Sequence, residues 1–102
     1  MQSQAVVQTP SGEIYLKKLC RHFAHKVPAM LSGEQGIIDF PFGRCRIAVG
    51  PDHIRLSTDL NDAHQAASAE GIVTEHLVCM ARREDLTVQW VRREQRPGSV
   101  AV

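Results

Sequence analysis

The sequence lacks paired cysteines, a long apolar run and an excess of either charge. Its three cysteines, Cys20, Cys45 and Cys79, are an odd number at wide spacings, which argues against a disulfide framework and against a zinc-ribbon site. Buried free thiols are the simplest interpretation of all three. No segment approaches the roughly 20 apolar residues of a membrane-spanning helix, so we expect none.

Charge and targeting signals narrow the class of protein further. Twelve basic and eleven acidic residues give a formal net charge of +1, so the bulk charge indicates neither nucleic acid nor a membrane as a partner. The first residues lack the basic start and apolar core of a signal peptide, which predicts a cytoplasmic location. At 102 residues, with 43% hydrophobic content, the chain is long enough for one domain with one core.

Motifs of the common catalytic sites are missing too. The sequence has no G-x-S-x-G nucleophile motif, no glycine-rich phosphate loop and no pair of acidic residues at a working spacing. A reactive thiol would need exposure beside a histidine, and the strand registers predicted below bury Cys45. The sequence therefore favours a non-enzymatic protein over an enzyme, and it leaves any cofactor unknown.

An amphipathic helix is predicted over about residues 10–26. Its apolar stripe follows the spacing of one helix face and consists of Leu16, Leu19, Cys20, Phe23 and Val27. Thr9 is the expected N-cap with Pro10 at the first helical position, and Pro28 marks the far end. The solvated side of this helix carries Lys18, Arg21, His22 and His25.

Beyond this helix the pattern changes to alternation, which predicts short strands. They cover residues 29–32, 36–40, 44–49 and 54–58, and residues 4–8 form an earlier strand. Pairing across the first tight turn places Ile38 opposite Cys45. Pairing across the following four-residue turn places Cys45 opposite Thr58. Both registers put the same apolar set on one face, which predicts an antiparallel meander.

A second helix is predicted over about residues 61–81, with Asp59 or Asn61 as its N-cap. Its inward stripe consists of Ala66, Ala69, Val73, Leu77 and Met80. Gly71, in the middle, weakens the helix by roughly 1 kcal/mol relative to alanine. The last predicted strand, residues 86–91, alternates and buries Leu86, Val88 and Trp90.

The predicted order is β-α-β-β-β-β-α-β. This is an α+β two-layer sandwich, in which both helices pack on one face of a mainly antiparallel sheet. The other sheet face is left to water or to a partner. Residues 1–92 form the single predicted domain, and residues 93–102, which show no periodicity, are expected to be a flexible tail.

Four blocks of sequence carry a resemblance to a known family. They are Leu19-Cys-x-His-Phe-Ala-His-Lys26, Phe40-Pro-Phe-Gly-x-Cys45, His76-Leu77 and Leu86-x-Val-x-Trp90. In this order they resemble DUF2218, a family of small bacterial proteins of unknown function, from about Ala5 to Val91. The resemblance implies no activity, but the proximity of some members to siderophore-interacting reductases implies a link to iron metabolism. The second helix departs from the family pattern, with small residues where bulkier ones are expected.

His22 and His25 are the candidate metal ligands. They lie about 60° apart around a regular helix and can share one ion. Cys20 points about 160° away from His22, into the apolar stripe, and is therefore not a ligand. His76 joins the site only if the two helices present these faces to each other. The alternative is that His22 and His25 are surface residues whose positive charge opposes the dipole at the helix C-terminus.

The outer sheet face is the candidate ligand site. It collects Arg44, Arg46 and Arg55, with Met30 and Ile37 at one side. This mixture suits a small anionic ligand, a protein partner or self-association. Single-stranded nucleic acid is disfavoured, because it stacks its bases on aromatic side chains and none is predicted here. The alternative is an ordinary solvated face.

Three hypotheses for the function follow. The first is a non-enzymatic binding or accessory protein that uses the arginine-bearing face, the Lys18 side of the first helix, or Phe42 at a hairpin tip. For Phe42 the alternative is a residue that caps the core. The second is a metal-linked or iron/siderophore-linked accessory protein that uses His22 and His25. The third is a homodimer or larger homo-oligomer whose sheet face or edge is the contact.

Overall fold

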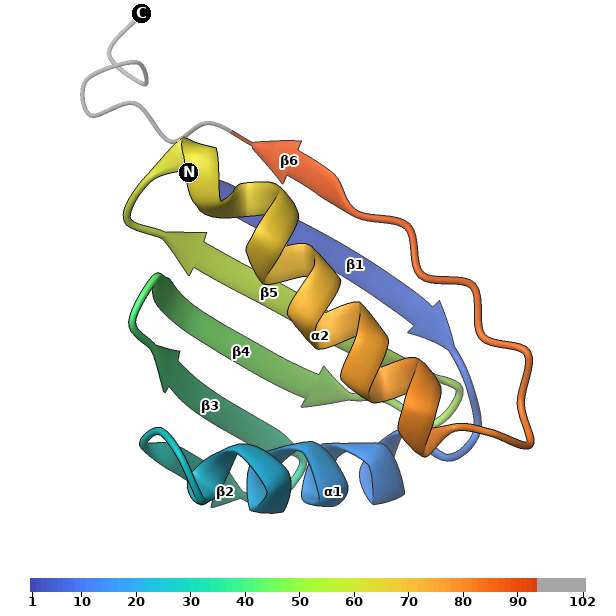
Figure 1. Cartoon of the computed structure of the whole chain (residues 1–102). Helices are drawn as coiled ribbons and strands as arrows, with labels where there is room; N and C mark the ends of the chain where they lie inside the picture. Colours follow the sequence, from blue (N-terminus) through green and yellow to red (C-terminus); the bar gives the residue numbers. More distant parts are fainter. Residues whose placement is uncertain (94–102) are drawn as a thin grey trace, which may run out of the picture.

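Two helices lie on one side of a six-stranded sheet in the computed structural model, which describes residues 1–93 (Figure 1). The strands are β1 (Gln2–Gln8), β2 (Ala29–Ser32), β3 (Gln35–Phe40), β4 (Gly43–Val49), β5 (His53–Leu60) and β6 (Val91–Arg93). The helices are α1 (Gly12–Ala24) and α2 (Ala66–Met80), and a short 3₁₀ helix, η1 (Ala63–Gln65), precedes α2. The predicted α+β class and two-layer arrangement are confirmed.

The sheet is antiparallel throughout, in the order β2-β3-β4-β5-β1-β6. The first strand of the chain therefore lies between β5 and β6 near one side of the sheet. The predicted registers are confirmed, because Ile38 pairs with Cys45 and Cys45 pairs with Thr58. Side chains of one parity face the helices along all these strands, and those of the other parity face away.

The core fills the space between the helices and the inner sheet face. Its fully buried members include Leu16 and Leu19 of α1, Leu77 of α2, and Ile38, Cys45, Ile47 and Leu56 of the sheet. The small side chains of α2 do not prevent packing, since Ala66 and Ala69 are both buried. Within the described residues, no helix has the length and apolar character needed to cross a membrane.

Two glycines are required where backbones approach closely. A Cβ at Gly36 would lie 2.7 Å from Leu16 Cδ1 and from Cys20 Sγ, so α1 sits directly on β3 there. Gly43 opens β4 with φ +151°, and a Cβ would lie 2.0 Å from the Asp59 carbonyl oxygen. Glycine is therefore required at position 43, where the β3–β4 turn ends.

The predicted helix starts are wrong at both helices. The N–H of Thr9 donates a hydrogen bond to the Asp52 carbonyl at 2.9 Å, next to the last pair of β1 and β5. The helix α1 therefore begins only at Gly12. The second helix starts in two steps, with η1 before α2, and the side chain that caps η1 is that of Asp62, which accepts from His64 N at 2.9 Å. Asp59 instead belongs to β5, which runs further than predicted.

The last strand is shorter and later than predicted. Leu86, Val88 and Trp90 do face the core and are half-buried, but residues 85–90 have no strand pairing, and β6 begins at Val91. The alternation of apolar and polar residues predicts which side chains face the core, but it does not predict whether the backbone pairs with a neighbouring strand. Arg93 belongs to β6, and residues 94–102 of the predicted tail lie outside the described residues.

We predict that Gly36→Ala lowers the free energy of unfolding by about 1–3 kcal/mol, because the new methyl group collides with Leu16 and Cys20. Urea denaturation followed by circular dichroism measures this change. Gly71→Ala is the matched control: its Cβ would meet nothing within 4 Å in the middle of α2, so it should raise the free energy of unfolding by about 0.5–1 kcal/mol. Equal effects of the two substitutions would contradict the close approach of α1 to β3.

Candidate functional site

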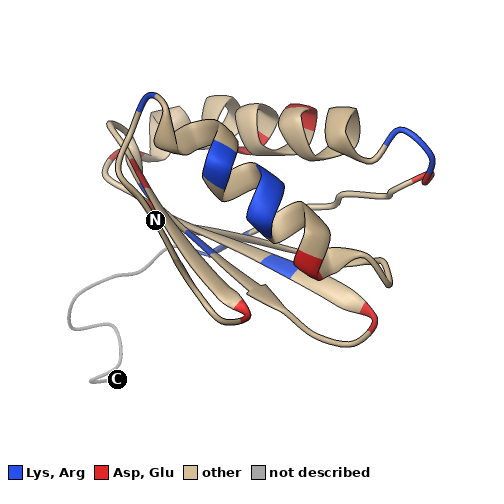
Figure 2. Cartoon of the chain, turned by 90° about the horizontal axis from the view of Figure 1, so that it is seen from below, with Lys and Arg blue, Asp and Glu red and all other residues tan. Residues whose placement is uncertain are grey.

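The outer sheet face is bare, because both helices cover the opposite side (Figure 2). The strand registers place Met30, Ile37, Arg46, Ser57 and Gln4 next to one another in one row across five strands. The same face is hollowed over β2 to β5, where a depression of about 410 Å³ lies. Its lining includes Met30, Ser32, Gln35, Ile37, Arg46, Ala48, Arg55 and Ser57. We call this depression the arginine hollow.

The three predicted arginines differ in how far acidic side chains neutralise them. Arg44 Nε lies 2.7 Å from Asp39 Oδ1, and this hydrogen bond raises the pKa of the guanidinium. Arg46 Nε lies 3.9 Å from Asp59 Oδ2, a loose and solvent-exposed pair. Arg55 forms no ion pair within residues 1–93. The arginine hollow therefore contains one free and one loosely paired guanidinium.

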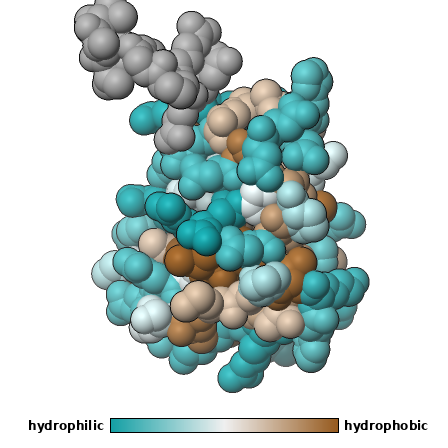
Figure 3. Space-filling model, turned by 90° about the vertical axis from the view of Figure 1, so that its left-hand side faces the viewer, coloured by the Kyte–Doolittle hydropathy of each residue, from teal (hydrophilic) through white to brown (hydrophobic). Residues whose placement is uncertain are grey.

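Lys18 and Phe42 lie away from the arginine hollow. Lys18 lines a groove of about 930 Å³ between α1 and the segment after α2, together with Ile14, Arg82 and Arg83. Phe42 is half-buried and stacks on Phe40, with ring centres 4.7 Å apart. Phe42 packs against a small second core cluster of Leu60, Ala66 and Ala69. On the face shown in Figure 3, apolar side chains gather in the lower half of the view.

The structure brings together a different pair of histidines from the predicted one. The ring centres of His22 on α1 and His76 on α2 lie 4.8 Å apart, whereas His25 is the exposed C-cap residue of α1 and has no recorded ring contact within residues 1–93. No three histidine, cysteine or acidic side chains in this part of the chain are grouped to hold a metal ion. Any ion at His22 would therefore need outside ligands.

The thiols differ in exposure, which corrects one prediction. Cys20 and Cys45 are buried, as predicted, but Cys79 is exposed. Burial raises the pKa of the Cys45 thiol to about 12 and also raises that of Cys20, so both stay protonated and unreactive near neutral pH. The burial of Cys20 and Cys45 therefore does not favour a nucleophilic role for either thiol.

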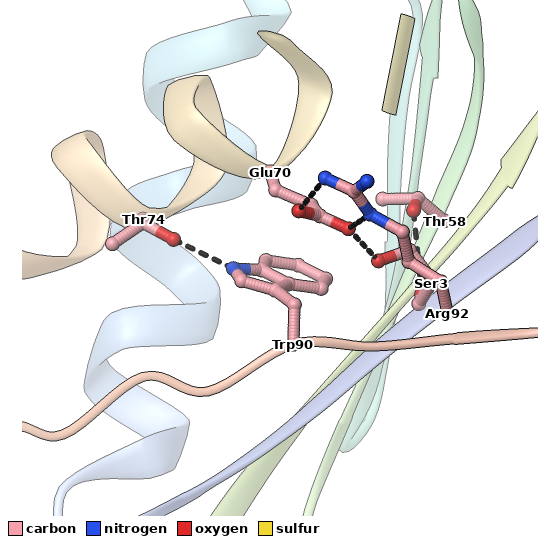
Figure 4. Close-up of polar contacts among 6 residues, drawn as sticks. All are labelled: Ser3, Thr58, Glu70, Thr74, Trp90 and Arg92. Carbon is pink, nitrogen blue, oxygen red and sulfur yellow. Dashed lines mark hydrogen bonds and ion pairs between the residues drawn. The ribbon is translucent and has the colours of Figure 1, made fainter. Parts of the chain in front are cut away.

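Sequence reasoning missed a buried polar cluster beneath α2 (Figure 4). Glu70 is only 9% exposed, and both of its carboxylate oxygens accept hydrogen bonds from Arg92, at 2.9 Å each. The hydroxyl of the buried Ser3 also donates to Glu70, and the Thr58 hydroxyl donates to the Ser3 carbonyl at 3.3 Å. The sequence signal was available, because Glu70 falls within the inward stripe of α2, where a carboxylate needs a partner.

A second cluster ties the end of α2 to the start of α1. Glu84 accepts hydrogen bonds from the hydroxyls of Thr9, at 2.8 Å, and Tyr15. These bonds lower the pKa of Glu84. The pKa of Tyr15 is raised, first by burial and then by its bond to the carboxylate. Both clusters hold elements together and neither faces the arginine hollow.

Comparison with known proteins identifies the family. A family described as "Uncharacterized protein conserved in bacteria (DUF2218)" matches residues 4–91. The chain belongs to this family. This confirms the resemblance that the four sequence blocks carry, and a comparison with curated proteins finds no match.

A solved structure supports the fold of this DUF2218 chain. It is described as "NMR structure of PA4090 from Pseudomonas aeruginosa" and is similar with a TM-score of 0.77 and 33% sequence identity. The match covers 92% of this chain and 98% of that one. Because the family is described as uncharacterised, these similarities establish family and fold and leave the function to be inferred from the site.

We predict that Glu70→Gln lowers the free energy of unfolding at pH 7 by about 1–3 kcal/mol, because the bidentate bond from Arg92 to a carboxylate is lost. Arg92 is half-exposed, which keeps the loss in this range. The pKa of Glu70 is lowered, first by the Arg92 hydrogen bond, so its stabilisation is complete above the ordinary carboxyl pKa of 4.5. It disappears as the pH falls through the lowered value.

Urea denaturation at pH 7, 5, 4 and 3 tests this prediction. The difference between wild type and Glu70→Gln should shrink toward pH 3. Glu75→Gln, on the exposed side of α2, is the control and should change stability little at any of these pH values. A Glu70→Gln penalty that stays constant down to pH 3 would show that the carboxylate charge does not stabilise the fold.

Proposed function

We propose that this DUF2218 chain is a binding protein whose ligand is a small amphipathic anion held in the arginine hollow. One observation carries the proposal: Arg55, without an acidic partner in the described chain, lies in the same depression as the apolar side chains of Met30 and Ile37. The volume of about 410 Å³ is within the roughly 300–1,000 Å³ of small-molecule sites.

The chemistry of the lining sets the class of ligand. A guanidinium binds carboxylate, phosphate or sulfate groups through two parallel hydrogen bonds. Met30, which is 68% exposed, is a flexible and polarisable side chain that adapts to an apolar ligand segment. The other polar groups of the hollow are the hydroxyls of Ser32 and Ser57 and the amide of Gln35. These groups hold an anion without providing a general base, which favours binding over catalysis.

The link to iron metabolism that the family resemblance implies suggests one kind of ligand to test. Ferric chelates that carry free carboxylates are anions, so they belong among the ligands to test. Cytoplasmic location stays a prediction from the sequence, as does the expectation that nucleic acid is not the partner.

Self-association is the second candidate function of this face. The exposed Met30, which lines the hollow, lies on the edge strand β2, and a second copy would cover its apolar surface. Size-exclusion chromatography with light scattering separates the two functions. A monomer at tens of micromolar would leave the hollow open to a ligand, and a dimer that Met30→Lys dissociates would favour self-association.

We predict that an anion of this class raises the melting temperature of the wild-type protein and that Arg55→Ala abolishes the rise. The amphipathic probe is a medium-chain fatty acid. Inorganic phosphate, citrate and ferric citrate, which have no apolar portion, test the anionic group alone, and each probe is used in a thermal-shift titration. A ligand at 100 times its Kd adds about 2.7 kcal/mol to the free energy of unfolding.

Arg44→Ala is the matched control for this titration. Arg44 lies on the same sheet face, but it is paired with Asp39 and does not line the hollow. It should therefore leave the ligand response intact. If no probe stabilises the protein, or if Arg44→Ala removes the response as fully as Arg55→Ala does, the arginine hollow is not the ligand site.

A further inference from the structure

Two histidines meet where α1 and α2 lie next to each other. The ring centres of His22 and His76 are 4.8 Å apart, and their planes are tilted by 46°. The ring of Phe23 lies beside both, 5.2 Å from His22 and 4.8 Å from His76. The pair therefore has an apolar wall on one side, while His22 is exposed to solvent on the other.

The hydrogen bond of His76 fixes which of its nitrogens is available. Its Nδ1 lies 2.7 Å from the Ile72 carbonyl oxygen, which can only accept a hydrogen bond. In the neutral ring Nδ1 therefore carries the proton and Nε2 keeps its lone pair. Histidines that bind metal ions are held in this way, with one ring N–H donated to a carbonyl or carboxylate. His22 has no ring hydrogen bond recorded among residues 1–93, so its ring is free to turn toward a shared ion.

The spacing of the two rings fits a shared ion. Two imidazoles that bind one metal ion through bonds of about 2.1 Å hold their ring centres roughly 5 Å apart. The observed separation of 4.8 Å is compatible with such a shared ion. Imidazole nitrogen suits zinc, cobalt, nickel and copper, whereas magnesium and calcium prefer oxygen ligands.

We infer that His22 and His76 form a two-histidine binding site for a late first-row divalent metal ion such as Zn²⁺ or Co²⁺. Two ligands leave coordination positions open, and water or an external ligand must fill them, because no third histidine, cysteine or acidic residue in the described chain joins the pair. Lys18, one helical turn before His22, and Lys26, two residues past the end of α1, favour an anionic external ligand. The bound ion would connect α1 to α2 directly.

The test uses the full chain without an affinity tag and Co²⁺ or Zn²⁺ alone as the probe. We expect either ion to raise the melting temperature by several degrees at millimolar concentration, and Co²⁺ to show visible absorption that saturates at one ion per chain. His22→Ala and His76→Gln should each weaken binding at least roughly tenfold. The melting temperature of each variant in EDTA shows that it still folds.

His25→Ala is the matched control, because His25 is the neighbouring histidine on α1 and is not in contact with His76. It should bind the ion as the wild type does. Equal loss in His25→Ala and His22→Ala, or a full response that persists in the His22→Ala/His76→Gln double variant, would overturn the site, as would no response of the wild type. Arg55→Ala should leave the metal response unchanged, so this result and that for the arginine hollow are independent.

Discussion

The arrangement of this protein depends on one constraint: both helices cover the same side of the sheet. Each strand residue then has a fixed side, because a shift of one position would exchange every buried and exposed side chain of that strand. An unpaired guanidinium is costly to bury, so the arginines of β4 and β5 can only be on the uncovered side. Gly36 and Gly43 serve this arrangement by letting α1 and the β3–β4 turn approach closely.

The clusters around Glu70 and Glu84 hold the chain after α2, whose position the alternation of apolar and polar residues does not predict. β6 pairs with β1 over three residues, which gives little backbone bonding. The bidentate Glu70–Arg92 bond and the 2.7 Å hydrogen bond from Trp90 Nε1 to the Thr74 hydroxyl add side-chain contacts on both sides of its start. Such bonds are worth more in a partly buried site than at the surface. Residues 90–93 are therefore held by side-chain bonds to α2 as well as by the pairing of β6 with β1.

Much of the fold could be predicted from the sequence because burial is periodic. The registers from β3 to β5 followed from two turns and the parity of residues such as Ile38 and Cys45. Helix starts could not be predicted in this way, because the choice between Thr9 and Gly12 depends on where the sheet hydrogen bonds end. For the candidate sites too, one part could be predicted from the sequence and another could not. Alternation placed Arg46 and Arg55 correctly on one face, whereas the pairing of His22 with His76 depends on how α1 and α2 lie side by side.

Neighbouring residues of β4 test the separation of the two faces most directly. Cys45 is fully buried and Arg46 is exposed. In a Cys79→Ser background, Arg46→Cys should make one thiol react rapidly with a thiol reagent under native conditions, while Cys20 and Cys45 stay unreacted until urea unfolds the protein. If Cys45 reacted as fast as the new thiol at position 46, the inner and outer faces would not be separated as described, and the arginine hollow would lose its basis.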